Sequence, residues 1–107
     1  MDPLKDETPT PFRIEVGCDH GVDVVRLFGE LDLVSSEAVE RTLVRCAGPV
    51  VVADLTELEF IDSTGLSALL LARHAILTRR HRLEIRGAHG PTRRIFEAAG
   101  LADVLDD

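Results

Sequence analysis

Apolar residues along the chain form short alternating or continuous runs, separated by longer stretches with a helical period. Residues 12–16 alternate apolar and polar, as a half-buried strand does, and residues 22–28 are typical of a second strand. Asp19-His20-Gly21 between them is typical of a turn, so we expect an antiparallel hairpin. Three further runs, 50–53, 58–61 and 83–86, predict the remaining strands.

Capping residues and apolar stripes predict three helices. The first follows Ser35 or Ser36, either of which can cap it, and ends near Ala47 before Gly48-Pro49. The third opens at Gly90-Pro91, and residues 101–105 then form a short strand or turn. The second, from about Thr64 to Arg80, has a predicted core stripe of Leu66, Leu69, Leu70, Ile76 and Leu77.

This alternation of strands and helices predicts an α/β fold with a mixed sheet. The hairpin supplies the antiparallel part, and the strand–helix–strand units supply the parallel part. The length of 107 residues suggests one domain, which we place at residues 12–107. Residues 1–11 are polar and rich in proline, and we expect a flexible tail there.

The candidate chemistry lies where the second helix begins. Asp54-Leu55-Thr56 ends the central strand, Phe60-Ile61 follows, and Asp62-Ser63-Thr64-Gly65-Leu66 opens the helix. Asp, Ser and Thr are typical of helix N-termini, because their side-chain oxygens accept backbone N–H groups that have no partner within the helix. The pattern therefore places two hydroxyl groups at the start of a helix, where an ordinary capping role is the simplest interpretation.

This stretch resembles the signature of the STAS domain, in particular that of the bacterial anti-sigma factor antagonists. Ser67 stands where many members of that family have glycine, and Gly29-Glu30-Leu31-Asp32 matches a second recurring piece. From the residues alone, Gly29 indicates a strand-to-helix loop with a positive φ. The resemblance implies that the helices lie mainly on one side of the sheet. It also implies that Ser63 is a phosphorylation site, with Asp62, Thr64 and Gly65 supporting it.

The mechanism that the resemblance implies is partner switching. The unphosphorylated chain would bind an anti-sigma factor that is also a serine kinase, phosphorylation of Ser63 would release it, and a PP2C-type serine phosphatase would reset it. A phosphate there adds about −1.5 to −2 charges beside the positive end of a helix. Candidate partner-binding residues are Ser67, Leu71 and His74 on the adjoining helix face, and Asp54, which is equally typical of a loop-forming aspartate.

Composition and charge restrict other functions. The net charge of −7 argues against nucleic acid or an anionic membrane surface as a partner. The chain has no signal-peptide pattern or run long enough for membrane insertion, so we expect a cytoplasmic protein. Cys18 and Cys46 fit no metal or redox spacing and are interpreted as free thiols at partly buried positions; no metal or cofactor is predicted.

Two other classes of function stay open. Ser63, His74 and Asp62 supply the residue types of a hydrolase triad. However, His74 lies ~16 Å further along the same predicted helix, and no Gly-x-Ser-x-Gly elbow is present. The second alternative is a STAS subunit of a membrane lipid-transport complex.

Overall fold

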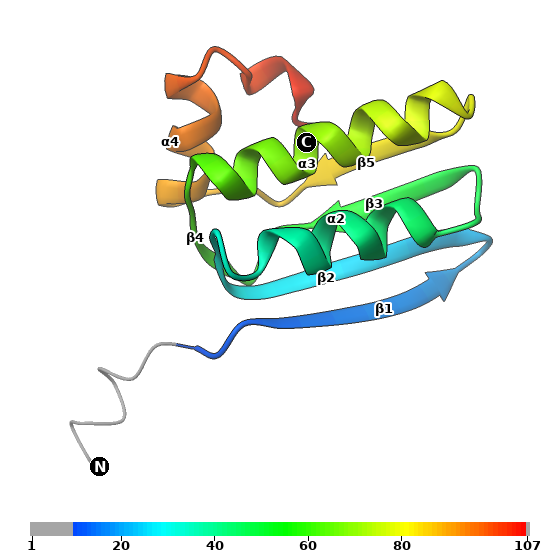
Figure 1. Cartoon of the computed structure of the whole chain (residues 1–107), viewed down its shortest axis with the longest axis horizontal. Coiled ribbons are helices and arrows are strands. Elements are labelled where there is room, and N and C mark those ends of the chain that lie inside the picture. Colours follow the sequence, from blue (N-terminus) through cyan, green and yellow to red (C-terminus); the bar gives the residue numbers. More distant parts are fainter. Residues whose placement is uncertain (1–9, 107) are drawn as a thin grey trace.

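A computed structural model describes residues 10–106 of the chain (Figure 1). The hairpin, the other strands and the three helices form where the apolar pattern predicts them, with ends shifted by a few residues. The predicted tail falls largely outside the described residues. The elements are β1 (Arg13–Asp19), β2 (Val22–Leu31), α2 (Ser36–Arg45), β3 (Val50–Asp54), β4 (Leu58–Ile61), α3 (Ser63–Thr78), β5 (Arg82–Arg86), α4 (Gly90–Ala98) and the 3₁₀ turn η1 (Ala102–Val104).

The strands form a mixed sheet in which β2 has the most neighbours. The order is β1-β2-β3-β5, antiparallel between β1 and β2 and parallel elsewhere. The first half of β2 pairs with β3, and its last residues pair with β4. The register shifts between Gly29 and Glu30, where Gly29 has a φ of 84°. The predicted positive φ at Gly29 is therefore right, but Gly29 lies within β2, opposite a bulge whose extra residue is Glu59 of β4, and not in the loop after the strand.

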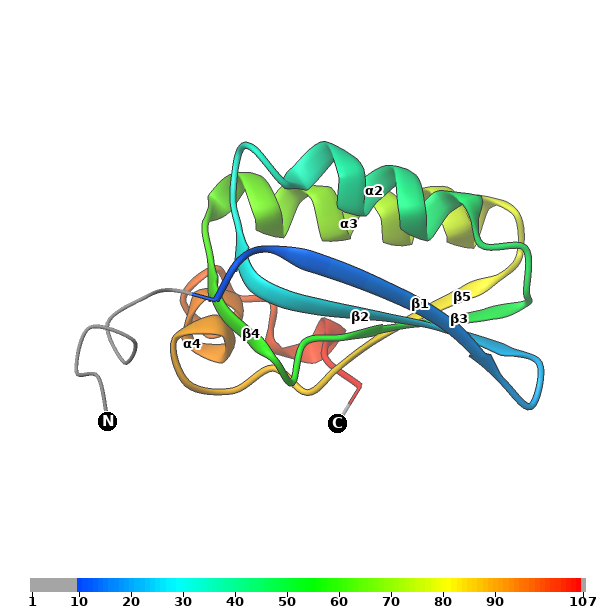
Figure 2. The same cartoon turned by 90° about the horizontal axis from the view of Figure 1, so that it is seen from below.

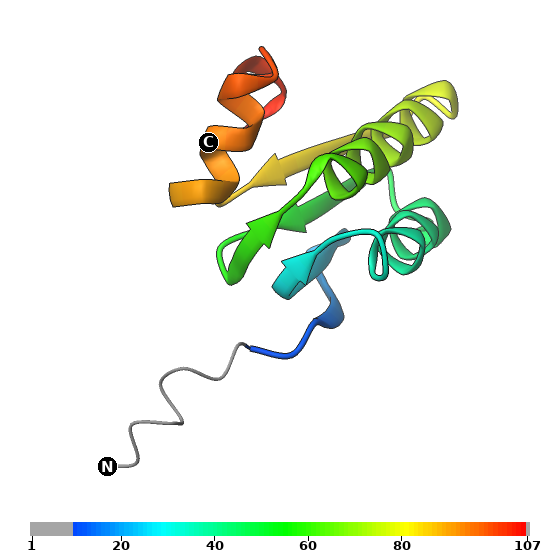
Figure 3. The ribbon, with the colours of Figure 1, turned by 60° about the vertical axis from the view of Figure 1, so that its left-hand side comes forward.

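Helices α2 and α3 run side by side over one face of the sheet, as expected (Figures 2 and 3). Alternate residues of each strand point to that face, and the ones that are buried beneath the helices are Val25, Leu27, Val51, Ala53, Leu83 and Ile85. Full burial of a Val, Leu or Ile side chain contributes about 1.5–3 kcal/mol. Helix α4 lies on the other side of the sheet and packs against β4, with Phe96 fully buried.

The predicted core stripe of α3 is partly wrong. Leu66, Leu69 and Ile76 are buried, but Leu77 is 46% exposed. The buried face is centred instead on the small residues Gly65, Ala68 and Ala72. Small side chains let α3 approach its neighbours closely, and this rotates Leu77 away from the core.

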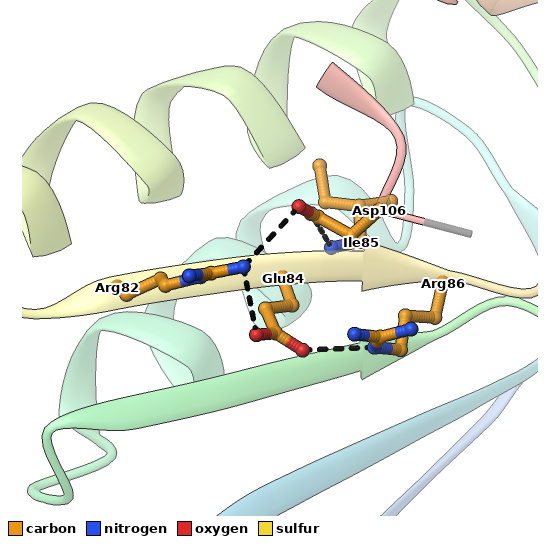
Figure 4. A network of polar contacts seen from close by, with 5 residues as sticks. All are labelled: Arg82, Glu84, Ile85, Arg86 and Asp106. Carbon is orange, nitrogen blue, oxygen red and sulfur yellow. Dashed lines mark hydrogen bonds and ion pairs between the residues drawn. The ribbon is translucent and has the colours of Figure 1, made fainter. Parts of the chain in front are cut away.

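The chain end covers the β5 margin of the sheet. Leu105 forms a parallel bridge to Ile85, and Asp106 N–H donates to the Ile85 carbonyl at 2.9 Å. The Asp106 carboxylate also accepts the Ile85 N–H at 2.9 Å (Figure 4). Arg82 lies 3.7 Å from that carboxylate and 3.0 Å from Glu84, so ion pairs join the chain end to β5. Residues 101–104 thus form the predicted turn, followed by Leu105 as a single bridge residue.

The two cysteines differ in exposure. Cys46 is half-buried, as expected, and burial, with a smaller contribution from the Asp23 charge, raises the pKa of its thiol. Cys18 is exposed, so its predicted partial burial is wrong. Its strand, β1, is the last strand of the sheet on that side and has exposed residues on both faces.

Candidate functional site

The candidate site is built around the first turn of α3. Asp62 is the N-cap residue, and its carboxylate accepts the Gly65 N–H at 2.8 Å. The predicted capping role of Asp62 is therefore confirmed. Ser63 is the first helical residue and is exposed, while Thr64 is half-buried. Within residues 10–106 the Ser63 hydroxyl has no hydrogen-bond partner, so it is accessible to a reaction partner from solvent.

A close contact fixes this turn against the end of β2. Asp62 N–H donates to the Leu31 carbonyl at 3.1 Å. A Cβ atom on Gly65 would lie 2.5 Å from the same carbonyl oxygen and 2.7 Å from Leu31 Cγ. Only a glycine fits there, so Gly65 determines how closely α3 approaches β2, and through that the position of Ser63.

The N-terminus of α2 lies next to this turn but is bonded differently. Ser35 is the N-cap, yet its side chain makes no capping bond. Its hydroxyl donates to the Glu30 carbonyl at 3.0 Å, and Asp32 carries out the capping-type contacts with the Val34 and Ser35 N–H groups at 3.0 and 3.3 Å. The Ser36 hydroxyl donates to the Asp32 carbonyl. Ser35 therefore takes the predicted N-cap position but does not cap with its side chain, because both serine hydroxyls are buried and bound to carbonyl groups while the Asp32 carboxylate accepts the nearby N–H groups.

A groove of about 270 Å³ runs between the first turns of the two helices. We call it the α2–α3 groove; its lining residues are Leu33, Ser36, Glu37, Glu40, Thr64, Ser67, Ala68 and Leu71. Leu33 and Leu71 on its two sides are 73% and 56% exposed. Exposed apolar side chains that flank a groove are typical of a surface that contacts another protein.

The predicted partner-binding residues separate into two places. Ser67 and Leu71 line the α2–α3 groove, and His74 is exposed further along the same helix. Asp54 does not join them, because alternation along β3 points it to the face away from α2 and α3. There its carboxylate accepts the N–H and hydroxyl of Thr56 at 3.0 and 2.6 Å and lies 3.7 Å from Arg26. These are the contacts of a loop-forming aspartate.

Sequence reasoning missed the α2 side of the groove. Leu33 lines the groove, and Val34, which is 90% exposed, follows it outside the groove; the two are consecutive apolar residues in a loop directly before a helix. That placement was the available signal, since neither residue belongs to an apolar stripe. The acids Glu37 and Glu40 carried no comparable signal, because exposed glutamates on a helix are common.

No metal site or membrane-spanning helix is found in the described part of the chain. No group of three His, Cys, Asp or Glu side chains within residues 10–106 is arranged to hold a metal ion. None of the helices described for those residues is both long and apolar enough to cross a bilayer.

Comparison with known proteins places this arrangement in a family. Residues 13–106 match the family model of the STAS domain, so the chain belongs to the STAS domain family. A curated relative, the anti-sigma-B factor antagonist of Listeria monocytogenes, is 34% identical over 82 residues, which cover 73% of this chain and 71% of that protein. The branch of the family that this chain resembles is therefore that of the anti-sigma factor antagonists.

Solved structures agree with this placement. An anti-sigma factor antagonist from Mycobacterium paratuberculosis has a TM-score of 0.77 and 28% identity, over 89% of this chain and 83% of its own. The Bacillus cell fate determinant SpoIIAA in its phosphorylated form has a TM-score of 0.68 over 91% of this chain and 90% of its own. At 24% identity that second likeness shows the fold alone.

Proposed function

We propose that this chain is an anti-sigma factor antagonist that acts by partner switching, with Ser63 as its phosphorylation site. In its unphosphorylated form it binds an anti-sigma factor that is also a serine kinase. Phosphorylation of Ser63 releases it, and a PP2C-type serine phosphatase restores the binding form. The observation that carries the proposal is the exposed Ser63 hydroxyl at the start of α3, which lies next to the α2–α3 groove and has no hydrogen-bond partner within residues 10–106.

The charges around the groove support a release mechanism based on repulsion and altered contacts. Glu37 and Glu40 line the groove, and Asp62 precedes Ser63. A phosphate adds about −1.5 to −2 charges to this already acidic surface. A partner whose surface complements the unmodified groove would then meet excess negative charge. The phosphate itself is accommodated, because N–H groups and the helix dipole favour an anion at a helix N-terminus.

The alternative function as a serine hydrolase would require a general base beside Ser63. A serine nucleophile needs a general base within hydrogen-bond distance, and the Ser63 hydroxyl has none within residues 10–106. We therefore favour a regulatory binding function. The lipid-transport alternative differs in its prediction, since it does not require phosphate uptake.

The phosphorylation test begins with capture of the partner kinase. The tagged chain is used to pull down proteins from the source cell, and these are identified by mass spectrometry. Incubation of the chain with the captured kinase and ATP should then add one phosphate, located on Ser63 by peptide mapping. Ser63→Ala should remain unlabelled. A phosphate on Thr64 or Ser67 would overturn the assignment.

The binding test uses variants that leave the core intact. Ser63→Asp should weaken kinase binding partially, because one carboxylate lacks the charge and oxygens of a phosphate, whereas Ser63→Ala should bind like the wild type. Leu71→Arg should weaken binding by at least ~1 kcal/mol, as expected for an interface contact. Leu77→Arg is the matched control, since Leu77 is a similarly exposed leucine of α3 outside the groove. Calorimetric titration in which Ser63→Asp and Leu71→Arg both bind like the wild type would place docking elsewhere.

A further inference from the structure

Within residues 10–106, one edge of the main sheet is covered and the other is uncovered. The β5 margin is covered by Leu105 and Asp106. Among residues 10–106, β1 pairs only with β2, on its inner side, and β1 is exposed over nearly its whole length (Figure 1). An uncovered edge strand presents a row of unpaired N–H and C=O groups, which is a template for another strand.

The register of the hairpin shows which backbone groups point outward. Asp19 pairs with Val22 across the two-residue turn His20-Gly21, where both φ values are positive, 52° and 80°. Such a turn is closed by a hydrogen-bonded pair, and hydrogen-bonded pairs alternate along an antiparallel ladder. The odd-numbered residues of β1 therefore bond to β2. Ile14, Val16 and Cys18 direct their backbone groups away from it.

We propose that this edge pairs with β1 of a second copy of the chain, antiparallel, about a two-fold axis at Val16. Val16 then faces Val16 of the second copy, and Ile14 faces Cys18 on either side. All the outward N–H and C=O groups of these residues find partners. Arg13 faces Asp19 at both ends of the paired strands, so opposite charges meet twice.

Charge selects this register over its neighbours. A slip that keeps the outward groups paired must move the strands by two residues. If Val16 pairs with residue 14 of the second copy, Glu15 lies opposite Glu15 of that copy. If Val16 pairs with residue 18 instead, Glu15 lies opposite Asp19. Like charges directly opposite each other destabilise an antiparallel pair. Only the register centred on Val16 pairs the full strand without such a conflict.

Apolar surface on the helix side of β1 favours the same arrangement. Val16 is 58% exposed and lines a groove with Thr42, Arg45 and Cys46 below the end of α2. In the paired form the two Val16 side chains lie next to each other and are removed from water.

The net charge of −7 on each chain opposes association. The contact is also small beside the ~1,600 Å² of a standard interface, so we expect a weak dimer with a dissociation constant of roughly 100 µM.

Sedimentation velocity of the full chain tests this at ~5 to ~500 µM and ~0.15 M salt, where the Debye length is about 8 Å. The wild type should shift from monomer to dimer over this range. Val16→Pro should stay monomeric, because proline removes only an N–H that faces away from β2 and is tolerated there in edge strands. A wild type that stays monomeric throughout overturns the proposal, as does a folded Val16→Pro that dimerises normally.

A charge exchange tests the register and does not depend on proline. Arg13→Asp places Asp opposite Asp19 and should weaken the dimer ~10-fold. The double variant Arg13→Asp/Asp19→Arg restores opposite charges and should return to within about threefold of the wild-type constant. A structural effect of Arg13→Asp, which also loses the contact of Arg13 with Phe28, would not be reversed in this way. Failure of the double variant to recover dimerisation overturns the Val16-centred register.

Discussion

Helices α2 and α3 begin next to each other, each with a serine as its first residue, but the two serines have opposite environments. Ser36 is 6% exposed and its hydroxyl donates to the Asp32 carbonyl. Ser63 is exposed and its hydroxyl has no partner within residues 10–106. The cause is the position of the nearby acid. Asp62 is itself the N-cap of α3, whereas Asp32 lies before the N-cap Ser35 of α2, and its backbone carbonyl accepts the Ser36 hydroxyl. A hydroxyl at a helix start is therefore available for modification only where it is exposed and no backbone carbonyl binds it.

The largest difference between the two helix starts should appear at their third residue. Gly65→Ala forces a Cβ against the Leu31 carbonyl oxygen, and we expect a loss of ~2 kcal/mol in the free energy of unfolding despite the higher helix propensity of alanine. The matched change in α2 is Ala38→Gly, which should cost only about 0.5–1 kcal/mol. Urea denaturation measures both. Equal losses would show that the close approach of α3 to β2 is not what distinguishes the two starts.

A smaller effect is expected when each serine is replaced by alanine. Ser36→Ala removes a buried hydrogen bond and should cost ~1 kcal/mol. Ser63→Ala removes an exposed hydroxyl and should change the free energy of unfolding by less than ~0.5 kcal/mol. The same denaturation series gives both values. A larger loss for Ser63→Ala than for Ser36→Ala would mean that Ser63 has a structural role.

Phosphorylation of Ser63 itself should also change the stability of the domain only slightly. The start of α3 accommodates an anion, so the melting temperature should change by no more than ~5 °C, which corresponds to about 1 kcal/mol in a domain of this size. Calorimetry on the phosphorylated and unmodified chains makes the comparison. A fall of more than roughly 10 °C would indicate that the phosphate acts by unfolding the first turn of α3, contrary to a repulsion mechanism.

Interactions between residues close in the sequence were predictable, whereas contacts and exposures that depend on distant segments of the chain were not. The cap by Asp62 was predictable because donor and acceptor lie within one helical turn. The side-chain cap of α2 was misassigned because Ser35, Ser36 and Asp32 all offer local acceptors, and the Glu30 carbonyl that binds Ser35 Oγ decides between them. The exposure of Leu77 depends on how closely α3 packs on its neighbours, and the face to which Asp54 points depends on which side of β3 the helices cover. The groove needed both helices in place before Leu33 and Leu71 could be seen as its two sides.

The register shift between β2 and β4 has a consequence for how this sheet can change in evolution. Inserting or deleting one residue in a strand normally turns every later side chain to the opposite face. In β2 the pairing with β3 lies before Gly29, and the pairing with β4 lies mostly after it. A one-residue insertion or deletion at Glu59, the extra residue of β4, would therefore change how the end of β4 and the start of α3 are placed, while Val25 and Leu27 keep their places in the core. The segment that presents Ser63 can thus be repositioned toward a new partner without redesigning the rest of the domain.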